Sequence, residues 1–155
     1  MRTTGALVLA ASFATSIASA EVSFKTETLT VPADDGVVTL TIEVADTPAR
    51  RSRGYMGRTD IGPRDGMLFV FEPPRNVSMW MKNTPTSLDM IFLEADGSIE
   101  SIAERTTPGS TAIVSSAGEV AYVLEVLAGS AERWGLEPGD VLESGRFDGP
   151  TDPDG

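Results

Sequence analysis

Residues 67–71 read MLFVF, and this short run decides how the chain folds. An extended strand of five consecutive apolar residues has no face suited to water, so the run predicts a central strand that is covered on both sides. Residues 72–76 (EPPRN) follow it, and their two prolines are expected to end the strand. We therefore place residues 67–71 in the middle of a sheet.

The segments around this run alternate apolar and polar residues, as strands do. Residues 24–31 and 37–44 alternate on either side of Asp34-Asp35-Gly36, which predicts a β-hairpin. Further strands are predicted at 77–83, 88–94, 98–103, 120–127 and 141–144, and short helices at 47–53 and 129–135. About eight strands and two helices indicate a mainly β chain, folded as a single-domain β-sandwich or barrel-like sheet with two short helices.

The first twenty residues predict a secretory signal peptide. Arg2 precedes an apolar and small-residue run, and Ala18-Ser19-Ala20 provides a cleavage site. We therefore expect residues 1–20 to be removed, residues 21–145 to form one domain, and residues 146–155 to be a disordered tail. No later run reaches the roughly 20 apolar residues of a membrane helix, so no stable membrane insertion is expected after cleavage. The expected location is periplasmic or secreted.

The residue types that are absent exclude several kinds of chemistry. The chain has no cysteine and no histidine. Catalytic Ser-His-Asp and Cys-His systems, ordinary zinc sites and haem attachment all need one of these residues. The sequence also lacks a glycine-rich phosphate-binding motif. We therefore predict no metal and no cofactor, and any enzyme activity would depend on carboxylate, lysine or tyrosine side chains.

Charge is unevenly distributed along the chain. The formal net charge is −11, and it becomes −12 once Arg2 of the signal is set aside. An acidic surface repels phosphate backbones, so no nucleic-acid partner is expected. Residues 50–82 are the exception, because they hold seven basic residues, Arg53 and Arg58 among them, against three acidic ones. This segment is either a set of solvated arginines or an anion-binding surface.

Residues 79–92 (MWMKNTPTSLDMIF) place Lys82, Asn83 and Asp89 among residues typical of a core. If the strands on either side of residues 84–87 form an antiparallel hairpin, Lys82 lies directly opposite Asp89. The same register puts Trp80 on the face of that pair.

Two interpretations of this arrangement stay open. In the first, Lys82 and Asp89 form a cross-strand ion pair that only fixes the register of the hairpin. In the second, the pair lines a cleft in which Lys82 binds an anion, Asp89 orients it and Trp80 offers a stacking surface.

Glu125 is a second carboxylate in an apolar setting, because it lies within residues 120–127 (VAYVLEVL). If this strand is buried, the carboxylate needs a cationic partner, which Lys82 or an arginine such as Arg53 could supply. If the strand lies at an edge, Glu125 points at water instead.

Several blocks of the sequence resemble one protein family. They are 54–58 (GYMGR), 65–71 (DGMLFVF), 80–84 (WMKNT), Leu88-Asp89, 123–125 (VLE), Ala128-Gly129 and Gly139-Asp140. Together they closely resemble the family catalogued as domain of unknown function 192, over about residues 37–144. The resemblance implies a single, mainly β domain that is often exported, and it implies no established activity. This chain departs from the family pattern at Tyr55, where leucine is usual, and at Ser87, where proline is usual.

The favoured hypothesis is a periplasmic binding or accessory module for a small anionic or polyhydroxylated ligand, or for an envelope partner. The candidate ligand-binding residues are Trp80, Lys82, Asn83, Asp89, Glu125, Arg53 and Arg58. One alternative is a hydrolase or transferase that uses Asp89 or Glu125 with Lys82. Another is a purely structural envelope protein.

Overall fold

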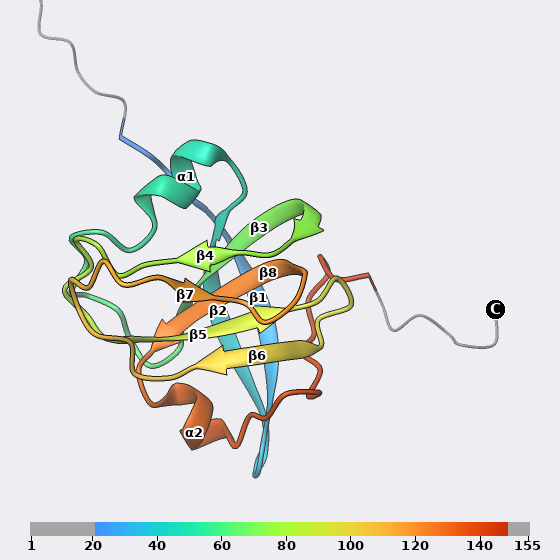
Figure 1. Ribbon diagram of the computed structural model, residues 1–155. Coiled ribbons are helices and arrows are strands. Elements are labelled where there is room, and N and C mark those ends of the chain that lie inside the picture. Colours follow the sequence, from blue (N-terminus) through green and yellow to red (C-terminus); the bar gives the residue numbers. More distant parts are fainter. Residues whose placement is uncertain (1–20, 149–155) are drawn as a thin grey trace, which may run out of the picture.

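The body of the domain is a six-stranded mixed sheet (Figure 1). The structure is a computed structural model, and it describes residues 21–148. The strand order is β1-β2-β3-β8-β5-β6, and β4 and β7 form a separate two-stranded sheet. The strands are β1 (Lys25–Ala33), β2 (Gly36–Ala45), β3 (Asp65–Arg75), β4 (Ser78–Met79), β5 (Leu88–Leu93), β6 (Ile99–Ala103), β7 (Val114–Ser115) and β8 (Val120–Leu127). The helices are α1 (Pro48–Arg53) and α2 (Ser130–Trp134).

The mainly β class with two short helices is confirmed. The predicted signal peptide over residues 1–20 lies outside the described residues. No helix within residues 21–148 is long and apolar enough to cross a membrane.

Strand β3 contains the run MLFVF and is central, as predicted. It pairs in parallel with β2 and antiparallel with β8, and each residue from 66 to 71 is buried. The strand continues past the predicted stop to Arg75, and its register against β8 shifts after Val70. The two prolines, Pro73 and Pro74, fall within that irregular part, where they interrupt the ladder without ending the strand.

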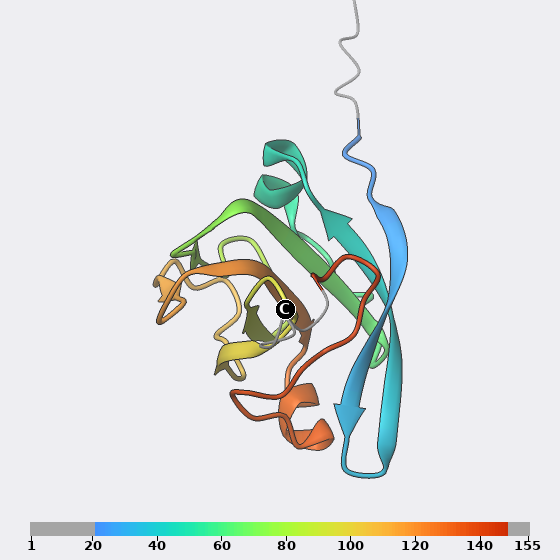
Figure 2. The same ribbon diagram turned by 90° about the vertical axis from the view of Figure 1, so that its right-hand side faces the viewer.

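Each face of the sheet carries its own apolar core. Figure 2 shows the two helices at opposite ends of the molecule, α1 at the top of the view and α2 at the bottom. On one face Leu68 and Leu124 pack with residues of β1, β2 and α2. On the other face Met67, Phe69 and Val123 pack under the chain that follows α1 and under β4. Successive side chains of β3 and β8 therefore enter different cores, which is why these strands are apolar throughout.

The predicted hairpin of residues 77–83 and 88–94 is wrong. Strand β5 pairs with β8 and β6, and β4 pairs with β7 across the Ser78↔Ser115 position. All six residues of β5 are buried, so this strand needs a neighbour on each side. Residues 80–84 leave the ladder in a turn in which Asn83 adopts a φ of 56°. Strand β7 was not among the predicted strands.

The C-terminal segment lies between the two edge strands of the sheet. The predicted strand at 141–144 is reduced to isolated bridges, Thr30↔Glu143 to β1 and Ser98↔Val141 beside β6. The backbone N–H of Thr30 donates to the Glu143 carbonyl at 2.8 Å, and the N–H of Ile99 donates to the Asp140 carbonyl at 2.8 Å. The sheet itself is open, and residues 139–143 connect its edges into a barrel-like shape.

The beginning of the predicted disordered tail is packed. The Arg146 guanidinium pairs with Glu27 at 2.6 Å, and the Phe147 ring lies 4.9 Å from that of Tyr122, measured between centroids. Phe147 also packs beside Gly97, where a Cβ atom would stand 2.5 Å from its ring. A large apolar residue therefore anchors residues 146–148 to the domain, whereas residues 149–155 lie outside the described part of the chain.

Candidate functional site

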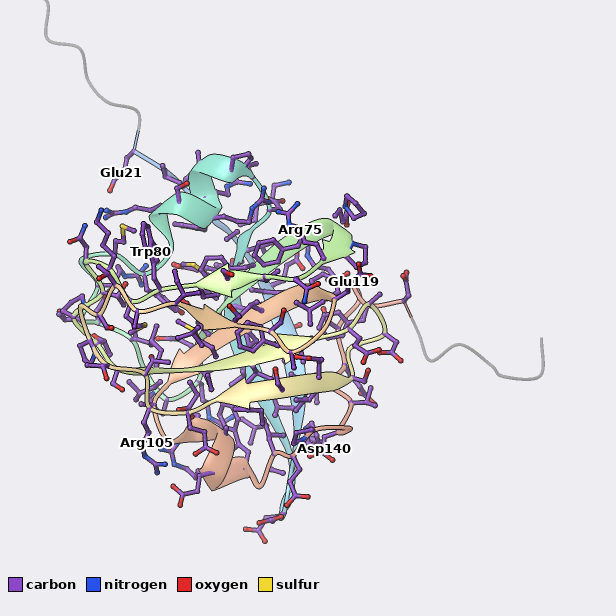
Figure 3. The ribbon with its side chains drawn as sticks, in the orientation of Figure 1. Glu21, Arg75, Trp80, Arg105, Glu119 and Asp140 are labelled. Atoms are coloured by element: carbon purple, nitrogen blue, oxygen red, sulfur yellow. The ribbon has the colours of Figure 1, made fainter. Side chains whose placement is uncertain are left out.

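A cleft of about 420 Å³ opens between α1 and β4. Its walls come from α1 and the turn after it, from β3, and from β4 with the residues that follow, while Glu125 of β8 contributes from within the sheet. Trp80 lies beside α1 on this side of the molecule (Figure 3). The volume falls within the range of small-molecule sites.

Glu125 is a buried residue whose side chain lines the cleft. The ladder places it between Met67 of β3 and Met90 of β5, and it is 4% exposed. No hydrogen bond or ion pair reaches its carboxyl group from residues 21–148. Burial raises the pKa of Glu125 from 4.5 to about 8. The group is therefore mostly protonated at neutral pH, and it can donate a hydrogen bond.

Tyr55 brings a second hydroxyl group to the same place. Gly54 ends α1 with a φ of 44°, and the chain there runs so close to Phe69 that a Cβ atom would stand 3.2 Å from its ring. This turn directs Tyr55 inward, where it is 2% exposed. Burial, reinforced by the carboxyl groups of Glu43 and Glu125, raises the pKa of Tyr55 above its ordinary value, so the hydroxyl stays protonated.

The oxygen atoms of Tyr55 and Glu125 both reach the cleft. Within residues 21–148, no side-chain nitrogen or oxygen is both fully buried and without a hydrogen-bond partner. No hydrogen bond reaches the side-chain oxygens of Tyr55 or Glu125 from the described residues, so these oxygens cannot be fully buried. The open space that they touch is the cleft, which both residues line. The floor of the cleft therefore presents two O–H groups that have no hydrogen-bond partner among the described residues.

Three basic side chains, Arg51, Arg53 and Lys82, also line the cleft. None of them has a carboxylate within 4.0 Å in the part of the chain that the structure describes. The Arg51 guanidinium is held by the Val70 carbonyl at 2.9 Å. The Lys82 ammonium lies 5.2 Å from the centre of the Trp80 ring, a cation–π distance. The rim is thus positively charged on an acidic protein.

Asp89 lies on the opposite face of the sheet, which makes the predicted pair with Lys82 wrong. Its carboxylate is fully buried and accepts the backbone N–H of Arg105 at 2.8 Å and that of Ala131 at 3.0 Å. Arg105 lies beside α2, away from Trp80 (Figure 3). Asp89 therefore holds the start of α2 and the chain just after β6, with both oxygens in use.

Asn83 and Arg58 also lie outside the cleft lining. The Asn83 carbonyl accepts the Gly57 N–H at 2.8 Å, which ties the turn after β4 to the turn after α1. Arg58 pairs with Glu43 at 3.1 Å and with Asp60 at 2.7 Å, and its guanidinium lies 5.5 Å from the centre of the Tyr55 ring. Both residues support the walls of the site from outside.

The cleft thus gathers Trp80, Lys82, Glu125 and Arg53 of the predicted set. Neither expectation for Glu125 is met, because β8 is an inner strand and no cation pairs with the carboxyl group among the described residues. The sequence analysis missed Tyr55 and Arg51. The departure from the family pattern at Tyr55 and the basic segment around Arg51 were the signals that pointed to them.

The sequence profile of DUF192, described as an uncharacterized ACR, matches residues 29–144. The chain belongs to the DUF192 family. Among curated proteins, none matches this DUF192 protein. Two crystal structures are similar to it. One, named as a candidate transcription regulator from Sinorhizobium meliloti, is 46% identical, with a TM-score of 0.76 over 79% of this chain and 96% of that one.

The other is a protein of unknown function from Novosphingobium aromaticivorans, 35% identical, with a TM-score of 0.73 over 77% of this chain and 85% of that one.

Proposed function

We propose that this DUF192 protein is an exported binding or accessory module that holds a small anionic ligand in the cleft between α1 and β4. One observation carries the proposal: Arg51, Arg53 and Lys82 line a cleft of about 420 Å³ without carboxylate partners among the described residues. In a chain of net charge −11, acidic partners are abundant. Basic groups kept free of them at a concave surface favour an external anion.

An anion suits the cleft better than a polyhydroxylated ligand or a protein partner does. Trp80 is 46% exposed and would be the natural stacking surface for a sugar. The Lys82 ammonium already lies over that ring, however, and a sugar would have to displace it. An envelope protein could contact Trp80, but it would leave the floor at Glu125 unused.

The periplasmic or secreted location is part of this proposal, and it rests on the sequence of residues 1–20. One similar structure is named as a candidate transcription regulator. A role of that kind in this chain is disfavoured by its acidic net charge of −11, which repels a phosphate backbone. Absence of a mobility shift with duplex DNA at low salt is the expected result.

The proposal is tested with the mature protein by calorimetry against benzoate, phosphate and sulfate. The double variant Arg53→Gln, Lys82→Met should bind the best of these probes at least about tenfold more weakly than wild type, because two charges near the anion are lost. Lys25→Met is the matched control, since Lys25 is exposed on β1, outside the cleft. Equal weakening in the control, or no saturable binding by any anion, would contradict the proposal.

A second candidate function follows from Glu125 alone. Its pKa of about 8 suits a general acid at neutral pH, and of the two carboxylates predicted for catalysis only Glu125 reaches the cleft. Such an enzyme would be a hydrolase or transferase that uses Glu125 with Lys82. Turnover of a small ester or glycoside that is lost in Glu125→Gln, while binding persists, would favour it. A purely structural envelope protein would show neither binding nor turnover.

A further inference from the structure

The floor and the rim of the cleft differ in chemistry. The rim is cationic, whereas the floor presents the O–H groups of Tyr55 and Glu125, two residues that are only 2% and 4% exposed. Neither group has a hydrogen-bond partner among the described residues, and both reach the open space of the cleft. Two such groups that line one cleft are well placed to bind a ligand that accepts hydrogen bonds.

The floor also limits what that ligand can be. Glu125 is paired with Met67 on one side and with Met90 on the other, and Phe69 and Phe71 line the same cleft. A phosphate or sulfate ion would lose most of its hydration against these apolar side chains. An organic acid loses less, because its apolar body can lie against the rings while its carboxylate accepts the two O–H groups.

We propose that the ligand is a small organic acid with an apolar body, whose carboxylate accepts hydrogen bonds from the Glu125 carboxyl group and the Tyr55 hydroxyl. This inference rests on the proposed function, and it assigns the ligand class and the residues that recognise it. The basic rim at Arg51, Arg53 and Lys82 attracts the anion into the cleft. The hydrogen bond from a neutral carboxyl group to a carboxylate is charge-assisted, and this makes it a strong one.

Binding of this kind requires Glu125 to carry its proton. Ionised Glu125 would repel the ligand and could not donate. The other charged or titratable groups around it are Tyr55 and the rim cations, with Glu43 behind Tyr55. The chain has no histidine and no cysteine, the side chains that ordinarily titrate in the range in which Glu125 does, so ligand affinity should follow Glu125 alone.

The experiment is calorimetry of the mature protein with benzoate, in two buffers of different ionisation enthalpy, from about pH 6 to about pH 9. In wild type, benzoate affinity should be constant below about pH 7.5 and fall about tenfold per pH unit well above pH 8. Near pH 9, binding should take up most of one proton per ligand. In Glu125→Gln the affinity should be independent of pH, with no proton uptake. In Tyr55→Phe it should be several-fold weaker with the wild-type pH dependence.

Benzamide serves as the neutral probe of the same shape, and it should bind at least about tenfold more weakly than benzoate at pH 6. Benzoate affinity that stays level up to pH 9 without proton uptake would overturn this inference, as would a pH dependence that persists in Glu125→Gln. If only phosphate or sulfate binds, and the double variant Arg53→Gln, Lys82→Met abolishes that binding, the proposed function stands and the organic-acid inference fails. If no anion binds, both fail.

Discussion

Replacing Glu125 by glutamine should remove most of the dependence of stability on pH between about pH 5 and pH 8. In the folded chain the pKa of Glu125 is raised to about 8, and in the unfolded chain it returns to about 4.5. Between these values the folded state holds one more proton than the unfolded state, so the free energy of unfolding falls as pH rises. The contribution of the Glu125 proton to the free energy of unfolding is fully present below pH 4.5, and it is lost as pH rises through about 8.

The size of this effect follows from the two pKa values. One pKa unit corresponds to about 1.4 kcal/mol, so the wild-type free energy of unfolding should fall by about 1.4 kcal/mol per pH unit over this range, and by up to about 5 kcal/mol in total. Histidine and cysteine, which ordinarily titrate between pH 6 and 9, are absent from the chain. The Glu125 carboxyl group should therefore dominate the profile.

The assay is urea-induced unfolding, followed by tryptophan fluorescence, at unit steps from about pH 5 to about pH 9. Wild type should show the decline and Glu125→Gln a nearly level profile, whatever the difference between their absolute stabilities at any one pH. Parallel profiles in the two proteins would refute the reasoning, because they would mean that Glu125 is ionised in the folded protein or titrates outside this range.

Three further outcomes are expected from the same unfolding assay. Asp89→Ala should cost about 3 kcal/mol, because the buried N–H of Ala131 and the partly buried N–H of Arg105 lose their acceptor, and it should speed hydrogen exchange at the Ala131 amide. A loss under about 1 kcal/mol would contradict this role. Lys82→Met should change stability by no more than about 0.5 kcal/mol, since Lys82 is exposed and lacks a carboxylate partner among the described residues; a loss above about 2 kcal/mol would mean that it holds the fold. Gly66→Ala should cost about 1–3 kcal/mol, because its Cβ would stand 3.2 Å from two buried aliphatic side chains. Gly145→Ala, whose Cβ meets nothing within 4 Å, should be nearly neutral, and equal effects of the two substitutions would show that the packing around β3 can relax.

Local patterns predicted the parts of the fold that depend on neighbouring residues. The β1–β2 hairpin follows from alternation around a two-residue turn, with Ala33 paired to Gly36. Helix α1 was located correctly, and its N-cap is Thr47, whose hydroxyl accepts the Arg50 N–H at 3.2 Å. Strand β3 was recognised as central because neither of its faces is polar.

Strand pairing between distant segments was not predictable in the same way. Residues 84–87 looked like a hairpin loop because they join two apolar segments at a common loop length. The hairpin does not form because β5 is fully buried and pairs with β8 and β6 in the sheet, which separates it from Ser78–Met79. Alternation gives the face of a residue only after its partner strand is known.

Only part of the candidate site could be predicted from the sequence, again because strand pairing is not visible there. Unusual residues could be recognised one by one, such as Glu125 in a strand of apolar residues and Lys82 beside Trp80. Which of them meet depends on the pairing of β8 with β3 and on the position of α1. Asp89 is an example of what the sequence does not reveal. Successive side chains of a strand point to opposite faces, and that of Asp89 points to the face on which α2 is held, not to the face of the cleft.

The segment at residues 139–143 has a consequence for how this protein behaves at high concentration. An open sheet normally exposes two rows of backbone N–H and C=O groups, which can pair with the sheet of another molecule. Here one short stretch of chain hydrogen-bonds with Thr30 on β1 and with Ile99 on β6, so it shields part of both edges. In a chain without cysteine, these five residues thus leave less of each sheet edge open to pairing with another molecule.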